Sequence, residues 1–372
     1  MTKIEKIEVY TVRITYQEPI RISLGVSATN DEVIVKIRDD EGYEGWGEGS
    51  PSLKILGETA GTMVSASDVI GPLLIGQDPE MLNYNLKLVY EAIKGNTAVK
   101  AAYDMALYDL YTKRLKIPLH KFLGGSRDRV EVDHTIGIVK IQEAEKKAKL
   151  LVKEGFKRIK LKVGSEDDID RVRAIRKVVG KETKMFIDAN QAWSPDKAVR
   201  LIKRLEPYEI ELVEQPVKAW DLSGMAFVRK KVDTPIMADE SVHDAIDAMR
   251  VVKAEAADFI NIKLMKCGGI REATRIADIS EAAGIRNIVG CMLEGGISIT
   301  AGVHFSCSTE NVTFTDLDSD IGLIDNFVKN GPAVKEGYRI IPKGIGLGNL
   351  RIDKRRLKKV RVYTKLRTFS TF

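Results

Sequence analysis

Apolar and polar residues alternate along several short runs near the start of the chain. Alternation with a period of two is typical of a β-strand that buries one face. After these runs the spacing changes, and residues 97–115 carry apolar side chains at three- and four-residue steps, which predicts a helix. Strands followed by helices predict a small α+β unit over residues 1–125. The predicted strands of this unit are residues 3–15, 33–40 and 42–48.

From residue 126 onward the pattern becomes strand, loop, helix, repeated. Eight short apolar segments recur, and amphipathic stretches with a helical period separate most of them. This alternation predicts an α/β fold, a (β/α) barrel over residues 126–320, with a doubly wound open sheet as the alternative. Residues 321–372 lack the rhythm, and we expect them to pack back on the N-terminal unit. The predicted barrel strands are residues 131–138, 158–164, 184–190, 210–216, 234–240, 258–264, 286–293 and 313–318.

The composition is that of a soluble globular protein. The 59 Lys and Arg are interspersed with 53 Asp and Glu along most of the chain, so the net charge of +6 does not indicate a nucleic-acid site. No uninterrupted apolar stretch reaches the roughly 18 residues of a membrane span, and the N-terminus has no apolar signal core. The three cysteines show no CxxC spacing, and their odd number argues against a disulfide framework. We therefore expect a cytoplasmic protein that binds no membrane.

A polar residue closes each of five consecutive predicted strands. Successive members of this series are about 25 residues apart, the length of one strand–helix unit. In a barrel this spacing places all five side chains around the C-terminal mouth, where barrel enzymes carry out their chemistry. The five residues are Lys162, Asp188, Glu214, Asp239 and Lys263.

The three acids of this series indicate a metal site. Three carboxylates on neighbouring strands repel one another unless a cation lies between them. An all-oxygen set without a well-placed His or Cys suits Mg²⁺, or Mn²⁺, over zinc. The alternative is that Asp188, Glu214 and Asp239 each pair with a nearby lysine.

The two lysines of the series indicate acid–base chemistry. The second and sixth strands of an eight-stranded barrel lie roughly opposite, so Lys162 and Lys263 would face each other across the metal. A base on each face of a metal-bound acid permits removal of the α-proton on one side and return on the other, through a metal-stabilised enediolate. Lys160, on the same strand face as Lys162, would depress the pKa of Lys162 by like-charge repulsion.

With these residues in place, the chain resembles the enolase superfamily, and within it the muconate-lactonising subgroup. The resemblance implies a modified (β/α)₇β barrel of the TIM type under an α+β capping domain that C-terminal residues complete. It also implies that loops near residues 15–30 and 47–60 close over the substrate. The motifs that carry it are IPLHKFLGG, Lys160-x-Lys162, Asp188-x-Asn190, Glu214-Gln215-Pro216, Asp239-Glu240 and Asn261-Ile-Lys263 followed by Gly268-Gly269.

The last predicted strand separates members of the subgroup. Its Asp316-x-Asp318 doublet resembles the Asp-x-Asp motif of dipeptide epimerases, whose two acids hold the terminal ammonium of the substrate. An extended dipeptide spans about 7 Å, enough to reach from a metal-bound carboxylate to this strand. A hydrocarbon acid offers these carboxylates no cation. The resemblance therefore implies Mg²⁺-dependent epimerisation of a dipeptide at the α-carbon of its C-terminal residue.

Alternatives remain open at this point. They are an o-succinylbenzoate synthase or cycloisomerase, an N-acylamino acid racemase, and a non-catalytic binding protein. Further candidates for substrate contact are Asn190, Arg21 in the first loop, and Glu294, which would also orient Lys263 or a neighbour. Gly25 stands where related enzymes that act on an acidic second residue tend to carry a basic group, which disfavours such a substrate. We also expect a homo-oligomer.

Overall fold

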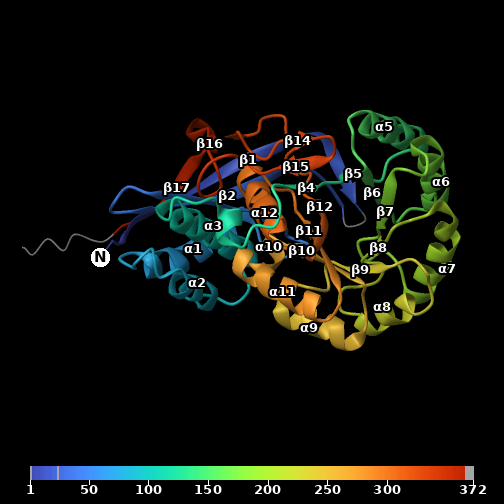
Figure 1. Ribbon diagram of the computed structural model, residues 1–372, viewed down its shortest axis with the longest axis horizontal. Helices are drawn as coiled ribbons and strands as arrows, with labels where there is room; N and C mark the ends of the chain where they lie inside the picture. Colours follow the sequence, from blue (N-terminus) through green and yellow to red (C-terminus); the bar gives the residue numbers. More distant parts are fainter. Residues whose placement is uncertain (1, 23–24, 365–372) are drawn as a thin grey trace, which may run out of the picture.

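The computed structural model describes residues 2–22 and 25–364. Figure 1 shows a ring of strands surrounded by helices and, beside it, a sheet with its own helices, which we call the barrel and the cap. The cap comprises β1, β2, β3, α1, α2, α3 and β17. The chain runs through the cap, then through the barrel, and returns to the cap at its end, where β17 pairs with β1.

The cap sheet has four antiparallel strands in the order β17-β1-β2-β3. Residues 32–37 of β2 are all buried, so both faces of this strand are covered and burial does not alternate as the sequence pattern predicts. β1 and β2 form a long hairpin that reaches the barrel, where Ile138 N donates to Arg21 O over 3.1 Å. The elements are β1 (Ile4–Ile22), β2 (Gly25–Asp39), β3 (Glu44–Gly49), α1 (Ala60–Leu74), α2 (Leu82–Glu91), α3 (Thr97–Arg114) and β17 (Lys358–Thr364).

The glycines of β3 permit close packing against α3. A Cβ atom on Gly47 would lie 1.9 Å from Ala102 O, and one on Gly45 would lie 2.0 Å from Ala106 O. Any larger residue would push the helix away from the sheet. The alternating glycines of this strand are therefore a packing device, and they fix the strand that leads into the loop after Gly49.

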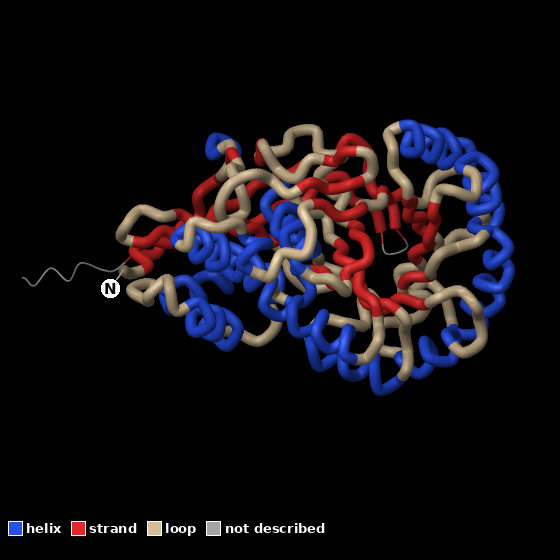
Figure 2. The backbone as a smooth tube through the Cα atoms, viewed as in Figure 1, coloured by secondary structure: helices blue, strands red, loops and turns tan. Residues whose placement is uncertain are grey.

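The barrel is an eight-stranded parallel sheet in the order β12-β11-β10-β9-β8-β7-β6-β5, with helices around it (Figure 2). Seven strand–helix units followed by a last strand make a (β/α)₇β barrel, as predicted. The strands are β5 (His134–Ile136), β6 (Arg158–Lys162), β7 (Lys184–Asp188), β8 (Val213–Glu214), β9 (Ile236–Ala238), β10 (Phe259–Lys263), β11 (Arg286–Gly290) and β12 (Val312–Asp316). The helices are α5 (Ile141–Lys153), α6 (Asp168–Val179), α7 (Pro195–Leu205), α8 (Leu222–Arg229), α9 (Ala245–Ala254), α11 (Ile270–Ala282) and α12 (Gly296–Ser308), with short α4 (Leu119–Phe122), α10 (Leu264–Cys267) and η1 (Glu206–Tyr208).

The first predicted barrel strand, residues 131–138, is wrong as a single element. Its beginning belongs to β4 (Arg129–Glu131), which pairs antiparallel with β15 (Tyr338–Ile340) outside the barrel. Only β5 joins the barrel sheet. Val132, between them, forms a parallel bridge to Thr315 of β12, and this bridge brings the first and last strands together. The polar–apolar pattern could not reveal the change because β15, the partner of β4, lies far away in sequence.

A layer of apolar side chains fills the barrel below its mouth. Side chains two residues apart on a strand leave from the same face. Phe186, Leu212 and Met237 stand two residues before Asp188, Glu214 and Asp239, and all three belong to one buried cluster. Phe259, Ile288 and Phe314 complete that cluster. The carboxylates therefore stand on a dry hydrophobic floor.

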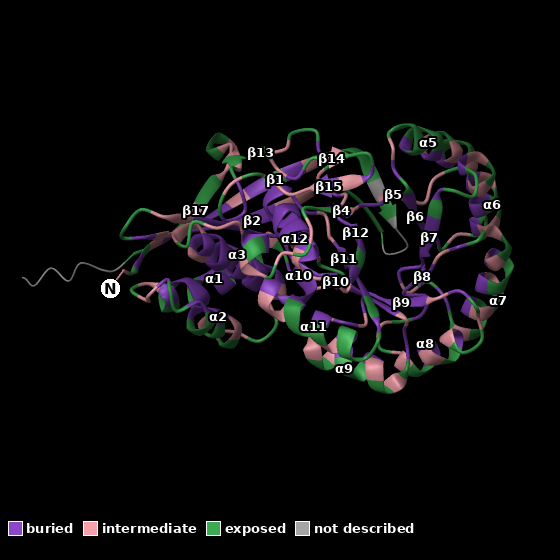
Figure 3. Cartoon of the chain, viewed as in Figure 1, coloured by how far each residue is buried: buried purple, intermediate pink, exposed green. Residues whose placement is uncertain are grey.

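The C-terminal segment contacts both parts of the molecule. Besides β15 and β17 it contains β13 (Val328–Lys329), β14 (Val334–Lys335), β16 (Arg351–Ile352) and η2 (Lys354–Arg356). These pairings support the division into residues 1–125, 126–320 and 321–372, which stays a prediction. In Figure 3 the barrel strands and α3 are buried, whereas the outer faces of the barrel helices are exposed. Within residues 2–22 and 25–364, no helix combines the length and apolar character needed to cross a lipid bilayer.

Candidate active site

Three buried carboxylates meet at the barrel mouth. Asp188 ends β7, Glu214 ends β8, and Asp239 follows β9 directly. All three side chains are inaccessible to solvent, and one oxygen of each lies within 4.8 Å of the others. The three carboxylates converge because neighbouring parallel strands are in register, so that Asp188 pairs with Glu214 in the sheet. The strand-end spacing predicted this convergence.

The donor set fits a divalent metal ion. Three converging carboxylates supply only oxygen ligands, the kind that Mg²⁺ and Mn²⁺ prefer. Neighbouring side chains hold two of the acids in place. Asn261 Nδ2 donates to Glu214 Oε1 over 2.7 Å, and Lys266 Nζ lies 2.7 Å from Asp239 Oδ1. These contacts leave Glu214 Oε2 and Asp239 Oδ2 directed toward the other acids and the active-site lysines.

The two predicted bases flank this triad. Lys162 Nζ lies 2.6 Å from Asp188 Oδ2, and Lys263 Nζ lies 2.9 Å from Asp239 Oδ2. They come from β6 and β10, the second and sixth barrel strands, and both side chains line the same cavity. The structure therefore gives each lysine a different acid of the triad as its partner.

Lys160 is the centre of the charge network. Its Nζ lies 3.0 Å from Asp188 Oδ2, 2.7 Å from Glu214 Oε2 and 2.7 Å from Asp316 Oδ2. Although burial disfavours its charge, these carboxylates raise the pKa of Lys160 well above its usual value. Lys160 is therefore a paired, permanent cation. The prediction that Lys160 depresses the pKa of Lys162 took account of the two lysines alone, without these carboxylates, and it stays a prediction.

Burial and charge act in opposite directions on the triad. Burial is the largest influence on Glu214 and raises its pKa to about 8. Burial acts in the same direction on Asp188, but Lys160 and Lys162 outweigh it and hold the pKa of Asp188 below its usual range. Against burial, Lys263 and Lys266 likewise hold the pKa of Asp239 well below its usual range. The lysines around the triad therefore favour the charged forms of Asp188 and Asp239.

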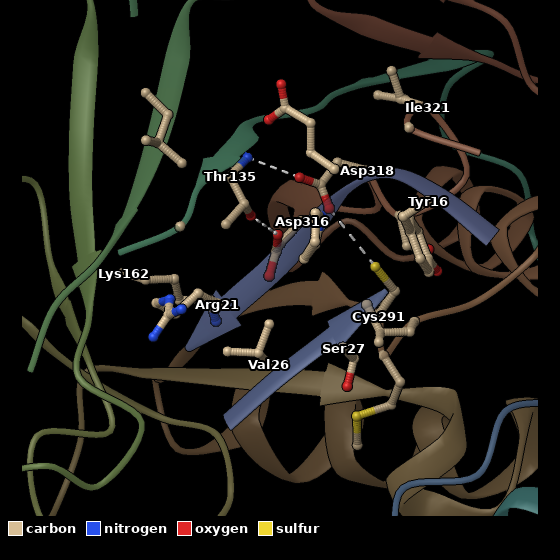
Figure 4. A pocket seen from close by; sticks show the side chains of 18 of the residues that line it. Tyr16, Arg21, Val26, Ser27, Thr135, Lys162, Cys291, Asp316, Asp318 and Ile321 are labelled. Atoms are coloured by element: carbon tan, nitrogen blue, oxygen red, sulfur yellow. Dashed lines mark hydrogen bonds between the residues drawn. The ribbon is translucent and has the colours of Figure 1, made fainter. Parts of the chain in front are cut away.

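A second acidic group lies near the triad and lines the cavity wall. Figure 4 shows Asp316 and Asp318 side by side next to Thr135. Thr135 N donates to Asp318 Oδ2 over 2.8 Å, and Thr135 Oγ1 donates to Asp316 Oδ1 over 3.4 Å. Asp316 ends β12, whereas Asp318 lies beyond the strand. The prediction that both acids stand on one strand is therefore wrong. The backbone beyond β12 still brings both into the cavity lining.

Arg339 fixes the bend that carries this doublet. Its guanidinium is buried and donates to Leu317 O, the carbonyl between the two acids, over 2.9 and 2.6 Å. It also bonds Pro332 O over 2.8 Å and pairs with Asp320. A residue of the C-terminal segment therefore supports the part of the site that carries Asp316 and Asp318.

The cavity lined by Lys162, Lys263 and the Asp316–Asp318 doublet has a volume of about 810 Å³. Such a volume accommodates a small peptide with bulky side chains. Its walls come from the barrel mouth, the β1–β2 hairpin and the loop after β3, which are the two loops expected to cover the site. In Figure 4, Arg21 and Lys162 occupy one side, with Val26 and Ser27 below and Tyr16 and Cys291 opposite.

Two of the remaining predicted residues differ in their placement. Asn190 lines the cavity, and its Nδ2 donates to Glu240 Oε1 over 3.2 Å. Glu294 does not line the cavity, and its Oε1 accepts from Met292 N over 2.7 Å. In the described part of the chain Glu294 forms no ion pair with Lys263, because its own loop takes up its carboxylate. The structure therefore gives no support to Glu294 as a substrate contact or as the group that orients Lys263.

Sequence reasoning missed three residues of the site. Asn261 stands two residues before Lys263, so strand alternation places both side chains on the same face. This spacing could have predicted that Asn261 lies in the site. Lys266 follows three residues after Lys263, on α10, which no strand-end pattern covers. Asp133 is fully buried close to Asp316 and Asp318, and neither of its oxygens has a hydrogen-bond partner in the described residues. Burial first, then Asp316 and Asp318, raise the pKa of Asp133 well above its usual value.

Family models match both parts of the chain. Residues 6–124 match the N-terminal domain of mandelate racemase and muconate lactonizing enzymes, and residues 143–354 match the enolase C-terminal domain-like model. The matches correspond to the cap and to the barrel with part of the C-terminal segment. Both models describe parts of the superfamily that the motifs indicated.

Individual proteins are similar over nearly their whole length. The chain is 44% identical to the hydrophobic dipeptide epimerase of Enterococcus faecalis, over 86% of this chain and 92% of that protein. It is 40% identical to the L-Ala-D/L-Glu epimerase of Bacillus subtilis, over 93% of this chain and 96% of that protein. The structure matches the dipeptide epimerase of E. faecalis in complex with Mg and L-Leu-L-Tyr with a TM-score of 0.91 and 42% identity, covering 93% of this chain and 99% of the other.

Proposed function

Because this chain belongs to the mandelate racemase and muconate lactonizing enzyme family of the enolase superfamily, we propose that it catalyses the Mg²⁺-dependent epimerisation of dipeptides. The observation that carries the proposal is the arrangement of charges in one cavity. Lys162 and Lys263, which contact the carboxylate triad, line one part of the cavity, and the Asp316–Asp318 doublet lines another part of its wall. A dipeptide zwitterion presents a carboxylate and an ammonium group about 7 Å apart, which matches this division.

The doublet end of the cavity selects an amine. Asp316 and Asp318 are held by Thr135 and by the Arg339-bound carbonyl of Leu317, so their oxygens are fixed before a substrate arrives. A free N-terminal ammonium donates three hydrogen bonds, whereas an N-acyl group has no positive charge. This end therefore favours a dipeptide over an N-acylamino acid or a hydrocarbon acid.

The triad end of the cavity holds the reaction centre. Asp188, Glu214 and Asp239 would hold a divalent cation, which would offset the negative charge that develops on the substrate carboxylate as the α-proton leaves. Asn261 and Lys266 keep Glu214 and Asp239 oriented for this role.

The lysines move the proton. We assign Lys162 and Lys263 as the two bases, one on each face of the α-carbon of the C-terminal residue. The neutral amine of one lysine accepts the α-proton, and the ammonium of the other returns a proton to the opposite face. One proton is taken and one is given, so the configuration inverts and the enzyme must exchange protons with solvent between turnovers. The low-lying apolar floor formed by Phe186, Leu212 and Met237 keeps bulk water from below the reaction centre.

Deuterium exchange tests the proposal. The protein with Mg²⁺ is incubated in D₂O with a library of L,L-dipeptides, and mass spectrometry follows α-deuterium while chromatography follows the L,D product. We expect deuterium and inversion at the C-terminal residue of at least one group of dipeptides, and neither in samples treated with EDTA. Absence of exchange across the library with Mg²⁺ present would disprove the proposed function.

Three finer points stay proposals. The first is the assignment of individual residues to the roles given above. The second is a homo-oligomer, which an exposed apolar surface supports: Trp220 before α8 is 82% exposed and Ile246 of α9 is 63% exposed. Light scattering behind a size-exclusion column measures the oligomeric state directly. The third is a cytoplasmic location, which fractionation of the source cells would test.

A further inference from the structure

Both covering loops are bound to one backbone carbonyl of the barrel. Asn30 belongs to β2 in the β1–β2 hairpin, and Ser50 directly follows β3, where the second covering loop begins. Asn30 Nδ2 donates to Leu293 O over 3.1 Å, and Ser50 Oγ donates to the same oxygen over 2.8 Å. Leu293 lies between β11 and α12, in a loop of the barrel mouth. We call the contacts of Asn30 and Ser50 with Leu293 O the latch.

A buried acid orients the latch. Glu32 of β2 is inaccessible to solvent, and its Oε1 accepts from Asn30 Nδ2 over 2.9 Å and lies 3.2 Å from Ser50 Oγ. An amide oxygen in place of Asn30 Nδ2 would face this carboxylate and the Leu293 carbonyl, both of which only accept hydrogen bonds. The surroundings therefore fix which end of the Asn30 amide points to the barrel.

The barrel loop that receives the latch also holds the residue after Asp318. Glu294 N donates to Ser319 Oγ over 3.1 Å, and Ser319 Oγ donates to Glu294 O over 2.8 Å. Cys291 of the same loop points toward Asp318 in Figure 4, with 4.0 Å between its Sγ and Asp318 Oδ1. A short path of contacts thus runs from the covering loops through Leu293 and Glu294 to the Asp316–Asp318 doublet.

The β1–β2 hairpin holds the other side of the doublet directly. Gln17 N donates to Gly322 O over 2.9 Å, and Ile324 N donates to Thr15 O over 2.9 Å. The doublet therefore lies between two attachments of the hairpin, one at residues 322–324 and one through the latch. Movement of the hairpin away from the barrel has to disturb both attachments.

We propose that Asn30 and Ser50 are positioning residues that couple closure of the covering loops to the placement of the Asp316–Asp318 doublet. This inference rests on the proposed function, in which the doublet binds the substrate ammonium. Substrate has to enter a cavity whose walls include both loops, so the loops open and close during turnover. Ser50 is buried outside the cavity lining, so it acts through Leu293 and not by touching substrate.

Kinetics of two variants test the latch. Ser50→Ala and Asn30→Ala each remove a neutral hydrogen bond, which is worth about 2–10-fold in an equilibrium constant. With the L,L-dipeptide that the D₂O library screen finds most active, we expect each variant to raise KM by this factor while kcat changes less. Ser65→Ala, exposed on α1, and Asn83→Ala, exposed on α2, are the matched controls and should keep the wild-type KM.

A double-mutant cycle distinguishes coupling from a general loss of structure. Residues that act through one network have non-additive effects, whereas independent residues have additive ones. In the Asp318→Asn background, Ser50→Ala should therefore raise KM severalfold less than it does in the wild type.

Hydrogen exchange supplies a readout that does not depend on turnover. With Mg²⁺ and a saturating amount of the same dipeptide, amide exchange of the wild type should slow in residues 25–30 and 50–57 and in residues 316–322 together. Because coupling is reciprocal, Ser50→Ala should reduce the slowing in residues 316–322, and Asp318→Asn should reduce it in both loop segments.

The outcomes separate this inference from the proposed function. An unchanged KM in both Ser50→Ala and Asn30→Ala, or full additivity with Asp318→Asn, would overturn the latch and leave the epimerase in place. Loop exchange that slows equally in the wild type and in Asp318→Asn would overturn it as well. Absence of epimerisation on every dipeptide in the presence of Mg²⁺ would overturn the proposed function, and the role of the latch with it.

Discussion

Lys160 Nζ lies 2.7 Å from Asp316 Oδ2, and this contact joins the Asp316–Asp318 doublet to the carboxylate triad. Lys160 stands on β6 and Asp316 ends β12, the second and the last strands of the barrel. The same ammonium group also contacts Asp188 and Glu214 of the carboxylate triad. One buried lysine thus links the carboxylate triad to the Asp316–Asp318 doublet, so a change of charge in either group alters the charge balance of the other.

Substitution of either flanking lysine should stop epimerisation. Lys162→Ala and Lys263→Ala each remove one of the two proton-transfer groups, and general acid–base catalysis contributes about 10²–10⁴-fold. We expect kcat for inversion to fall by about 10³-fold or more in both variants. Each variant should retain α-proton exchange with one substrate stereoisomer only, because the remaining lysine serves one face.

The exchange pattern makes this prediction specific. It is measured by mass spectrometry in D₂O with the L,L and L,D forms of one dipeptide supplied separately. Lys177→Ala, an exposed lysine of α6, is the matched control and should behave as the wild type. Full activity of both active-site variants would show that these lysines are not the bases.

Removal of one triad carboxylate should abolish stabilisation by Mg²⁺. A ligand that binds only the folded state at about a hundredfold excess over its Kd stabilises that state by about 2.7 kcal/mol. We expect Mg²⁺ to raise the Tm of the wild type and to have little effect on Asp239→Asn. Differential scanning calorimetry with and without Mg²⁺ measures the difference within each variant, so an altered Tm of the metal-free protein does not matter. Asp278→Asn on the exposed face of α11 should keep the wild-type response.

Neutralising Asp318 should weaken dipeptide binding with little effect on folding. Asp318 contributes a charged hydrogen-bond acceptor, and such a bond is worth about 1.5–3 kcal/mol, or about 10–100-fold in KM. We expect Asp318→Asn to raise KM for a dipeptide in this range while kcat changes less. Steady-state kinetics with a dipeptide and its N-acetyl derivative checks the assignment, because the variant should lose most of the discrimination between them. A KM unchanged in Asp318→Asn, with the exposed Asp170→Asn as control, would contradict it.

The contact between cap and barrel should weaken as pH rises. Glu48 of β3 accepts hydrogen bonds from Gly295 N, Ile297 N and Ser298 N over 3.0, 2.9 and 2.9 Å, at the start of α12. Burial outweighs these three donors and raises the pKa of Glu48 to about 7 from its usual 4.5. A raised acid pKa stabilises the folded protein fully below about pH 4.5, and this contribution is lost as pH rises through about 7.

Thermal unfolding between pH 5 and pH 8 measures this effect. The Tm of the wild type should fall over this interval, and Glu48→Gln, whose side chain cannot ionise, should show a smaller fall. The rise in the pKa of Glu48 corresponds to a contribution of at most about 3 kcal/mol to the free energy of unfolding. Glu182→Gln, exposed before β7, should keep the wild-type slope. An identical slope in Glu48→Gln would show that Glu48 does not titrate in this range.

Local spacing along the chain predicts the barrel and the positions of its polar strand-end residues. At the end of these short strands an apolar residue is followed two positions later by a polar one, as in Phe186 and Asp188 or Met237 and Asp239. This pattern is local, so it can be recognised without knowledge of distant contacts. Strand alternation places each pair on one face, and parallel strands one unit apart bring the polar members to one rim. Lys162, Lys263 and the triad were therefore predictable from spacing.

The partners of these charged side chains, and the loops that cover them, come from contacts between distant parts of the chain. Lys160 finds Asp316 about 150 residues away, Lys54 fills the space beside Gly25 from another loop, and Glu48 caps a helix that begins near residue 296. Long-range contacts leave no periodic signal in the chain, because either partner would look the same with a different neighbour. The division of residues 131–138 between two sheets failed to appear in the pattern for the same reason. Spacing along a strand is set by covalent geometry, whereas pairing across the fold is set by packing of the whole molecule.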